Sequence, residues 1–189
     1  MFGAKTFIKT HGHQTLPSTN IMTKTKKPIK ILAFDPGSRY LGVAVLENWE
    51  LIYWGVKTFK NRTSPQLFLS EVRKVVSKLI GFYQPDIVAQ EKISLPQSQS
   101  SEQLNKLFRE IKKLAKQQGL AYGEYASNTV RKQICQNGRA TKKETAKIIV
   151  SLYPELAINL TQDRAWKEKY WGHMFDAVAV GLCCRRKLK

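Results

Sequence analysis

The chain has 189 residues, and 42% of them are hydrophobic, which is enough for one domain with a sizeable core. It carries 32 Lys and Arg against 14 Asp and Glu, a formal net charge of +18. A domain this basic most often meets a polyanion, usually nucleic acid, although ribosomal and highly soluble proteins are basic too. No apolar run reaches the roughly 18 residues of a membrane span. Three cysteines without a Cys-x-x-Cys pair argue against a disulfide framework or a zinc site.

Residues 1–28 differ in composition from the rest of the chain. They hold five lysines, no acid and no hydrophobic periodicity. This composition predicts a disordered basic arm rather than a secretory signal, which would need a continuous apolar core. Met22 is an alternative start, and the sequence leaves that choice open.

Residues 29–189 alternate between strand and helix patterns. Apolar runs predict strands at 29–34, 41–48, 50–59, 85–91 and 120–126, the first three as an antiparallel meander. Helices are predicted at 64–80 (N-cap Ser64, then Pro65), 100–118, after a Ser127 cap, 141–152 and 173–186, with a turn at Gly138 and a polar, aromatic-containing connection at 154–171. This order predicts an α/β protein of RNase H-like fold, a mixed five-stranded sheet with helices on both faces.

Two of the predicted strands end in a carboxylate. Asp35 closes the first strand and Glu91 closes the strand at 85–91. If both strands are central and parallel, these ends lie side by side at the sheet edge where α/β proteins bind ligands. His173 and Asp176 are three residues apart on the last predicted helix, so they share one face and can converge on the same edge.

Three carboxylates in one place repel one another and therefore need a cation. Oxygen ligands favour Mg²⁺ or Mn²⁺ over zinc. Two such ions about 4 Å apart can activate a water and hold a phosphodiester, which in a basic protein indicates a nuclease. Each residue also has a plainer interpretation: Asp35 as a turn former, Glu91 as a solvated acid, Asp176 as a partner of a lysine, and His173 as a structural histidine.

Four motifs stand in order over residues 29 to about 186: FDPGSRYLGVAVLEN, IVAQEKI, EYASNTVRKQICQNGRATKKETAKIIVSLY and HMFDAVAVGL. Together they resemble the RuvC family of Holliday-junction resolvases. The resemblance implies a nuclease domain at 29–189 that is a homodimeric, magnesium-dependent endonuclease. Such an enzyme makes paired symmetric nicks in four-way junctions, with 5′-phosphate and 3′-hydroxyl products, in DNA recombination and repair. It implies two Mg²⁺ per active site, with Mn²⁺ as a substitute.

The same resemblance assigns roles to individual residues. The metal ligands and catalytic acids carry over onto Asp35, Glu91 and Asp176, with His173 where some members have Asp. Arg131 and Lys142 match the basic residues near the scissile phosphate, although solvated helix charges are the alternative. The aromatic residue that family members often carry after the second carboxylate is missing, because Ser94 and Leu95 stand there.

Contacts to the DNA backbone are expected from a set of lysines and arginines between residues 104 and 147. These are Lys106, Arg109, Lys112, Lys113, Lys116, Lys132, Arg139 and Lys143. The apolar face of the helix at 100–118 is a candidate dimer surface by resemblance, or ordinary core. A branch-migration helicase is an expected partner. No membrane contact is expected, and the location is expected to be cytoplasmic and nucleoid-associated, with an organellar matrix as the alternative.

Two other functions stay open at this point. One is an RNase H-like nuclease acting on RNA, as YqgF-like rRNA-processing factors do, or on mobile-element DNA. The other is a non-catalytic junction- or RNA-binding module. The stretch VRKQICQNGRATKKE and the His-x-x-Asp helix favour the resolvase, and the complete set of acids argues against a module without catalysis.

Overall fold

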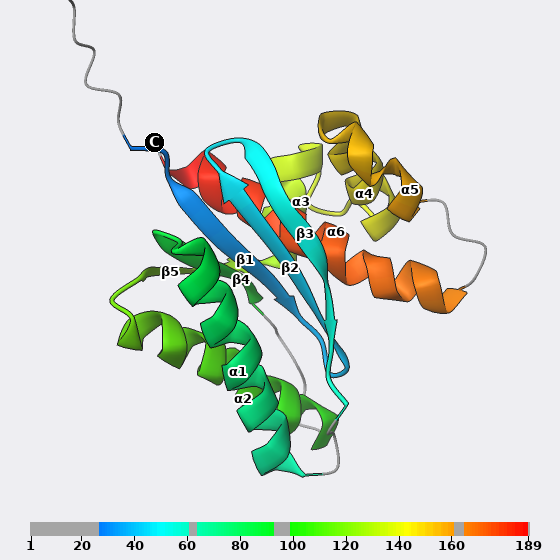
Figure 1. Cartoon of the computed structure of the whole chain (residues 1–189). Coiled ribbons are helices and arrows are strands. Elements are labelled where there is room, and N and C mark those ends of the chain that lie inside the picture. Colours follow the sequence, from blue (N-terminus) through cyan, green and yellow to red (C-terminus); the bar gives the residue numbers. More distant parts are fainter. Residues whose placement is uncertain (1–26, 61–63, 93–98, 161–164, 189) are drawn as a thin grey trace, which may run out of the picture.

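A computed structural model of the chain describes residues 27–60, 64–92, 99–160 and 165–188. The predicted basic arm lies almost wholly outside these residues, as do Ser94 and Leu95. Five strands form one sheet in the order β3-β2-β1-β4-β5 (Figure 1). They are β1 (Lys30–Pro36), β2 (Tyr40–Glu47), β3 (Glu50–Thr58), β4 (Ile87–Lys92) and β5 (Ala121–Ala126). The first three strands are antiparallel and the pairs β1–β4 and β4–β5 are parallel, which confirms the predicted mixed sheet and its meander.

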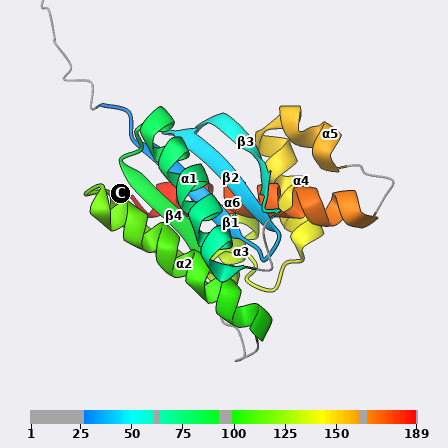
Figure 2. The same ribbon diagram turned by 60° about the horizontal axis from the view of Figure 1, so that its bottom comes forward.

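Helices cover both faces of the sheet, as predicted (Figures 1 and 2). One face carries α1 (Pro65–Tyr83) and α2 (Gln99–Gln117), and the other carries α3 (Ser127–Cys135), α4 (Lys142–Leu152) and α6 (Ala165–Lys187). A 3₁₀ turn (Pro154–Leu156) and the short α5 (Ala157–Leu160) link α4 to α6. Among the described helices, none is both long and apolar enough to span a membrane.

The central strands of the sheet carry apolar side chains on both faces, because a layer of helices covers each face. In β1, Leu32 and Phe34 pack under α1 and α2, while Ile31 and Ala33 pack under α6. The apolar face of α2 also lies in this core: Leu107 and Ile111, for example, are fully buried. Of the two predictions for this helix face, dimer surface or ordinary core, the structure therefore agrees with ordinary core.

Capping residues start helices α1 and α4, and the first of these caps is predicted from the sequence. At α1 the Ser64 hydroxyl accepts a hydrogen bond from the Leu67 N–H, and Pro65 opens the helix. At α4 Thr141 and Glu144 form a reciprocal capping box. The Ser127 prediction is wrong: Ala126 is the N-cap of α3, and Ser127 is the first residue of the helix, with its hydroxyl used elsewhere.

The last helix begins at Ala165, about two turns before the predicted start. The early turns do not show an apolar stripe in the sequence, but tertiary contacts hold them. Tyr170 stacks edge-on against Tyr40 at 5.2 Å between ring centroids, and its hydroxyl donates a hydrogen bond to the Val56 carbonyl at 3.2 Å. Trp171 packs against the core cluster.

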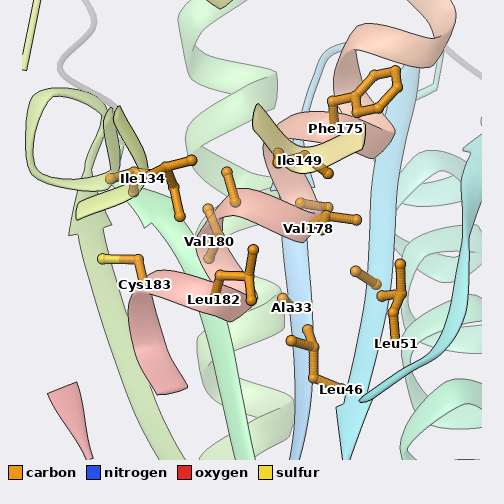
Figure 3. Close-up of a cluster of buried hydrophobic side chains, with 14 of the residues drawn as sticks. Ala33, Leu46, Leu51, Ile134, Ile149, Phe175, Val178, Val180, Leu182 and Cys183 are labelled. Carbon is orange, nitrogen blue, oxygen red and sulfur yellow. The ribbon is translucent and has the colours of Figure 1, made fainter. Parts of the chain in front are cut away.

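Glycines at the contact let helix α6 lie close to the sheet. A Cβ on Gly42 would be 1.8 Å from the His173 carbonyl oxygen, and one on Gly181 would be 2.3 Å from Leu46 Cδ1. Figure 3 shows the resulting packing, with α6 side chains between the sheet residues Ala33 and Leu46 and the covering helices α3 and α4. These glycines set the depth at which α6 presents its polar residues to the sheet edge.

Candidate active site

Three carboxylates from separate elements meet at one end of the sheet. Asp35 lies near the end of β1, Glu91 near the end of β4, and Asp176 in the middle of α6. One oxygen of each lies within 4.8 Å of an oxygen of both others. Strands β1 and β4 pair Phe34 with Gln90 in parallel register, so the next residue of each strand is an acid at the same level of the sheet. The prediction that the ends of these two parallel strands lie side by side is therefore confirmed.

His173 contacts the acid cluster through Asp35. Its Nδ1 lies 2.5 Å from Asp35 Oδ2, and only 8% of Asp35 is exposed. The other edge of the ring faces the Pro-Gly turn, because a Cβ on Gly37 would lie 2.6 Å from His173 Cε1 and 3.0 Å from Nε2. His173 is therefore placed as a hydrogen-bonding partner of Asp35, and its role as a metal ligand stays a prediction.

The two predicted basic catalytic residues lie in different surroundings. Lys142, the first residue of α4, forms an ion pair with the Asp176 carboxylate, and 63% of its side chain is exposed. Its ammonium is thus at the cluster and open to a ligand. Arg131 is half-buried on α3, and the described residues include no ion pair that joins its guanidinium to the three acids.

Ser127 contacts Glu91. Because β4 and β5 pair Lys92 with Ala126, the residue after β5 lies beside the end of β4, and the Ser127 hydroxyl donates a hydrogen bond to the Glu91 carboxylate. The sequence interpretation missed this residue by treating it as a helix cap. The strand register would have been the signal that identified it.

The electrostatics of the cluster reflect crowding of negative charge. Burial and the repulsion of Asp35 raise the pKa of Glu91 to about 7, against the downward effect of the Ser127 hydrogen bond. Burial and Asp35 likewise raise the pKa of Asp176. Burial lowers the pKa of Lys142, but the attraction of Asp176 outweighs it and the net shift is upward. Closely spaced carboxylate oxygens that resist ionisation fit a hard divalent cation, which would relieve their repulsion.

The predicted DNA-contacting residues divide between the two helix layers. Lys132, Arg139 and Lys143 are exposed on α3, the turn after it and α4, the layer that contains α6. The other five lie on α2 across the sheet: Lys106, Arg109, Lys112, Lys113 and Lys116. Lys112 forms an ion pair with Glu124 at 3.2 Å. Lys116 lies beside the start of β5, at the opposite end of the sheet from Glu91. Their contacts to DNA stay predictions.

A cavity of about 830 Å³ opens next to the carboxylates, between α4, α5 and α6. Lys142, His173 and Asp176 are among its lining residues, so the cavity adjoins the acid cluster. Trp171, which the sequence placed in an irregular connection, lines it from α6.

Comparison with known proteins identifies the family of this site. The family model described as crossover junction endodeoxyribonuclease RuvC matches residues 31–184, most of the chain. The chain belongs to the RuvC family. A RuvC relative from Chlorobium phaeovibrioides is 26% identical over 159 residues, which cover 81% of this chain and 79% of the relative.

Two solved structures share the fold. The structure of Thermus thermophilus RuvC in complex with Holliday junction substrate matches with a TM-score of 0.65 at 17% identity, over 82% of this chain and 91% of that one. The yeast mitochondrial Holliday junction resolvase Ydc2 matches with a TM-score of 0.64 at 12% identity, over 84% of this chain and 78% of that one. These matches confirm the predicted RNase H-like fold. RuvC is a family of metal-dependent nucleases, and the three carboxylates of this chain form a group that could hold a metal ion.

Proposed function

We propose that this RuvC-family protein resolves four-way DNA junctions by paired symmetric nicks, as a homodimer. The observation that carries the proposal is the convergence of Asp35, Glu91 and Asp176 within 4.8 Å at the end of a RuvC-type sheet. The net charge of +18 supports a polyanionic substrate. The Thermus thermophilus relative, which was solved with a Holliday junction substrate, supports a branched one.

The cofactor in this proposal is a pair of Mg²⁺ ions, replaceable by Mn²⁺. Asp35, Glu91 and Asp176 would hold them, since carboxylate oxygens are the ligands that both metals prefer. When bound, the ions supply the polarisation of the phosphodiester and of the attacking water. His173 Nδ1 lies 2.5 Å from Asp35 Oδ2 and fixes the orientation of that carboxylate. The Ser127 hydroxyl does the same for Glu91, so both acids are oriented before substrate binds.

The basic residues of the site act on the phosphate. Lys142 is exposed at the cluster and would hold a phosphate oxygen and stabilise charge that develops on it during cleavage. Its ion pair with Asp176 keeps the ammonium within reach of the scissile bond. Arg131 belongs to the proposal as a second cation, one helix away on α3. The products are a 5′-phosphate and a 3′-hydroxyl, which a ligase can join.

Exposed cations extend the site into a DNA-binding surface. Lys143, Lys132 and Arg139 lie in the α3–α4 layer and would contact phosphates on either side of the cleavage point. A branch-migration helicase is the proposed partner, because resolution needs a junction moved into position. The proposed location is with the genome that supplies the junctions.

The test offers the purified protein a mobile four-way junction, the matching linear duplex and an RNA hairpin, each with Mg²⁺ or EDTA. We expect symmetric nicks in the junction alone and only with Mg²⁺. Asp35→Asn should bind the junction without cutting it, while Glu50→Gln, an exposed acid on β3, should cut normally. Cleavage of RNA only, or binding of junctions without any metal-dependent cutting, would overturn the proposal.

A further inference from the structure

The cavity beside the acid cluster is larger than phosphodiester hydrolysis requires. Its volume of about 830 Å³ lies within the range of small-molecule binding sites. Hydrolysis itself needs only the sheet edge, where Asp35, Glu91 and Asp176 meet. The cavity lies beside that edge between α4, α5 and α6, and most of its lining has no part in the proposed chemistry.

The lining combines flat apolar surface with hydrogen-bonding groups. Trp171 is half-buried in the wall, and Phe175, 5% exposed, lies one turn further along α6. Asn159 and Glu168 bring an amide and a carboxylate to the same wall. Aromatic surface with a few polar groups is the chemistry that binds an unstacked nucleobase, through stacking and contacts to the base edge.

The positive charge around the cavity favours binding of a nucleotide, which carries phosphate, over an uncharged aromatic molecule. Lys142, Lys143, Lys147 and Lys169 line the cavity, against the acids Glu168 and Asp176. Cations at the rim would hold the backbone phosphates while the base enters the apolar part. Because Lys142 belongs both to the rim and to the acid cluster, a phosphate that it holds is next to the cavity mouth.

We propose that this cavity binds one base of the junction DNA, unstacked from the nucleotide next to the scissile phosphate, and that Trp171 is the residue on which it stacks. This inference rests on the proposed function, since it names the substrate group that the same site holds. If the cavity holds this base, its lining residues Trp171, Asn159 and Glu168 help to determine which phosphodiester is cut. A base that is already unpaired at a branch point enters most easily, so the cavity favours junctions over continuous duplex.

The test places 2-aminopurine at each position that flanks the crossover of a junction, because its fluorescence is strongly quenched between two neighbouring bases and is higher when the base stacks on one face only. The full-length protein binds this DNA with Ca²⁺ in place of Mg²⁺. We expect a several-fold rise at one flanking position with the wild type and little rise with Trp171→Ala. Trp49→Ala is the matched control, because Trp49 lies at the turn between β2 and β3, stacked on Arg185 and outside the cavity lining. It should give the wild-type rise.

A second measurement needs no variant. Wild-type protein is given a junction with an abasic site at the responsive position, and its affinity should fall several-fold. The absence of a fluorescence rise at every position, an unchanged rise in Trp171→Ala, or equal affinity for abasic and intact junctions would each overturn the base pocket. Cleavage of the junction with Mg²⁺ is scored separately. A protein that nicks junctions without unstacking a base refutes this inference alone, and one that never nicks refutes the proposed function.

Discussion

Replacing Glu91 by glutamine is expected to stabilise the metal-free protein at alkaline pH while abolishing cleavage. Glu91 is a carboxylate whose pKa is raised from 4.5 to about 7, first by burial and then by the repulsion of Asp35. Glutamine has nearly the same shape and keeps an oxygen that can accept the Ser127 hydrogen bond. The substitution therefore removes the charge and leaves the packing.

The magnitude follows from the pKa of Glu91. One pKa unit corresponds to about 1.4 kcal/mol, so the ionised side chain destabilises the folded state by about 3 kcal/mol relative to a solvated one. Because the folded pKa is the higher one, the contribution of Glu91 to stability is full below pH 4.5 and is lost as the pH rises through 7. Glutamine does not titrate, so the variant suffers no such loss.

The assay is urea unfolding in EDTA at two pH values. At pH 8.5 the free energy of unfolding of Glu91→Gln should exceed that of the wild type by about 3 kcal/mol, and at pH 5 the difference should shrink to below about 1 kcal/mol. Mg²⁺ at pH 8.5 should stabilise the wild type more than the variant, because the cation relieves the same repulsion. Glu50→Gln, on the exposed start of β3, should show neither effect. A difference that does not depend on pH, or a variant that is less stable at pH 8.5, would refute the electrostatic reasoning.

Three further substitutions probe the site. Lys142→Ala should lower the single-turnover cleavage rate about 100- to 1,000-fold, with junction affinity in gel shifts nearly unchanged, and a large loss of affinity instead would make Lys142 a binding residue. Ser127→Ala should raise the Mg²⁺ concentration for half-maximal cleavage and for thermal stabilisation about 10-fold or more, and unchanged metal dependence would contradict its role at Glu91. Gly42→Ala should destabilise the protein by about 1–3 kcal/mol in urea unfolding, because the new Cβ would meet the His173 carbonyl, and full stability would show that α6 can shift freely.

The parts of the structure that could be predicted from the sequence are those set by local pattern. Runs of apolar residues that end in Asp35 and Glu91 implied buried parallel strands, and parallel strands bring their ends together. The three-residue spacing of His173 and Asp176 placed both on one helix face. These inferences need only strand and helix periodicity, which neighbouring residues determine.

The parts that could not be predicted depend on contacts between elements. Ser127 follows a strand and precedes a helix, the position of a cap, and only the pairing of β5 with β4 turns its hydroxyl to Glu91. The first turns of α6 lack an apolar stripe and are held by Tyr40 and the Val56 carbonyl, more than a hundred residues earlier. The pairing of His173 with Asp35 likewise depends on where Gly37 lies.

The close approach of α6 to the sheet couples the acid cluster to the proposed base pocket. His173 and Asp176 serve the first and Trp171 lines the second, all within two turns of one helix. A shift of this helix would therefore move Asp176 and the Trp171 ring together. At Gly42 the obstacle to a side chain is the backbone of His173 itself, which cannot move without displacing the helix.

At Gly181 the obstacle is the tip of Leu46, which can change rotamer. Gly181→Ala is thus the milder of the two changes. It should still tilt α6 without unfolding the protein, because Leu46 is fully buried and the Ala33 Cβ lies 3.3 Å from the new Cβ. We expect it to slow cleavage and to weaken the 2-aminopurine signal in the same variant, although Gly181 lies outside the cavity lining and the acid cluster. If cleavage slowed while the fluorescence rise stayed at its wild-type value, the two sites would not share the position of α6, and the coupling argued from Gly42 and Gly181 would be wrong.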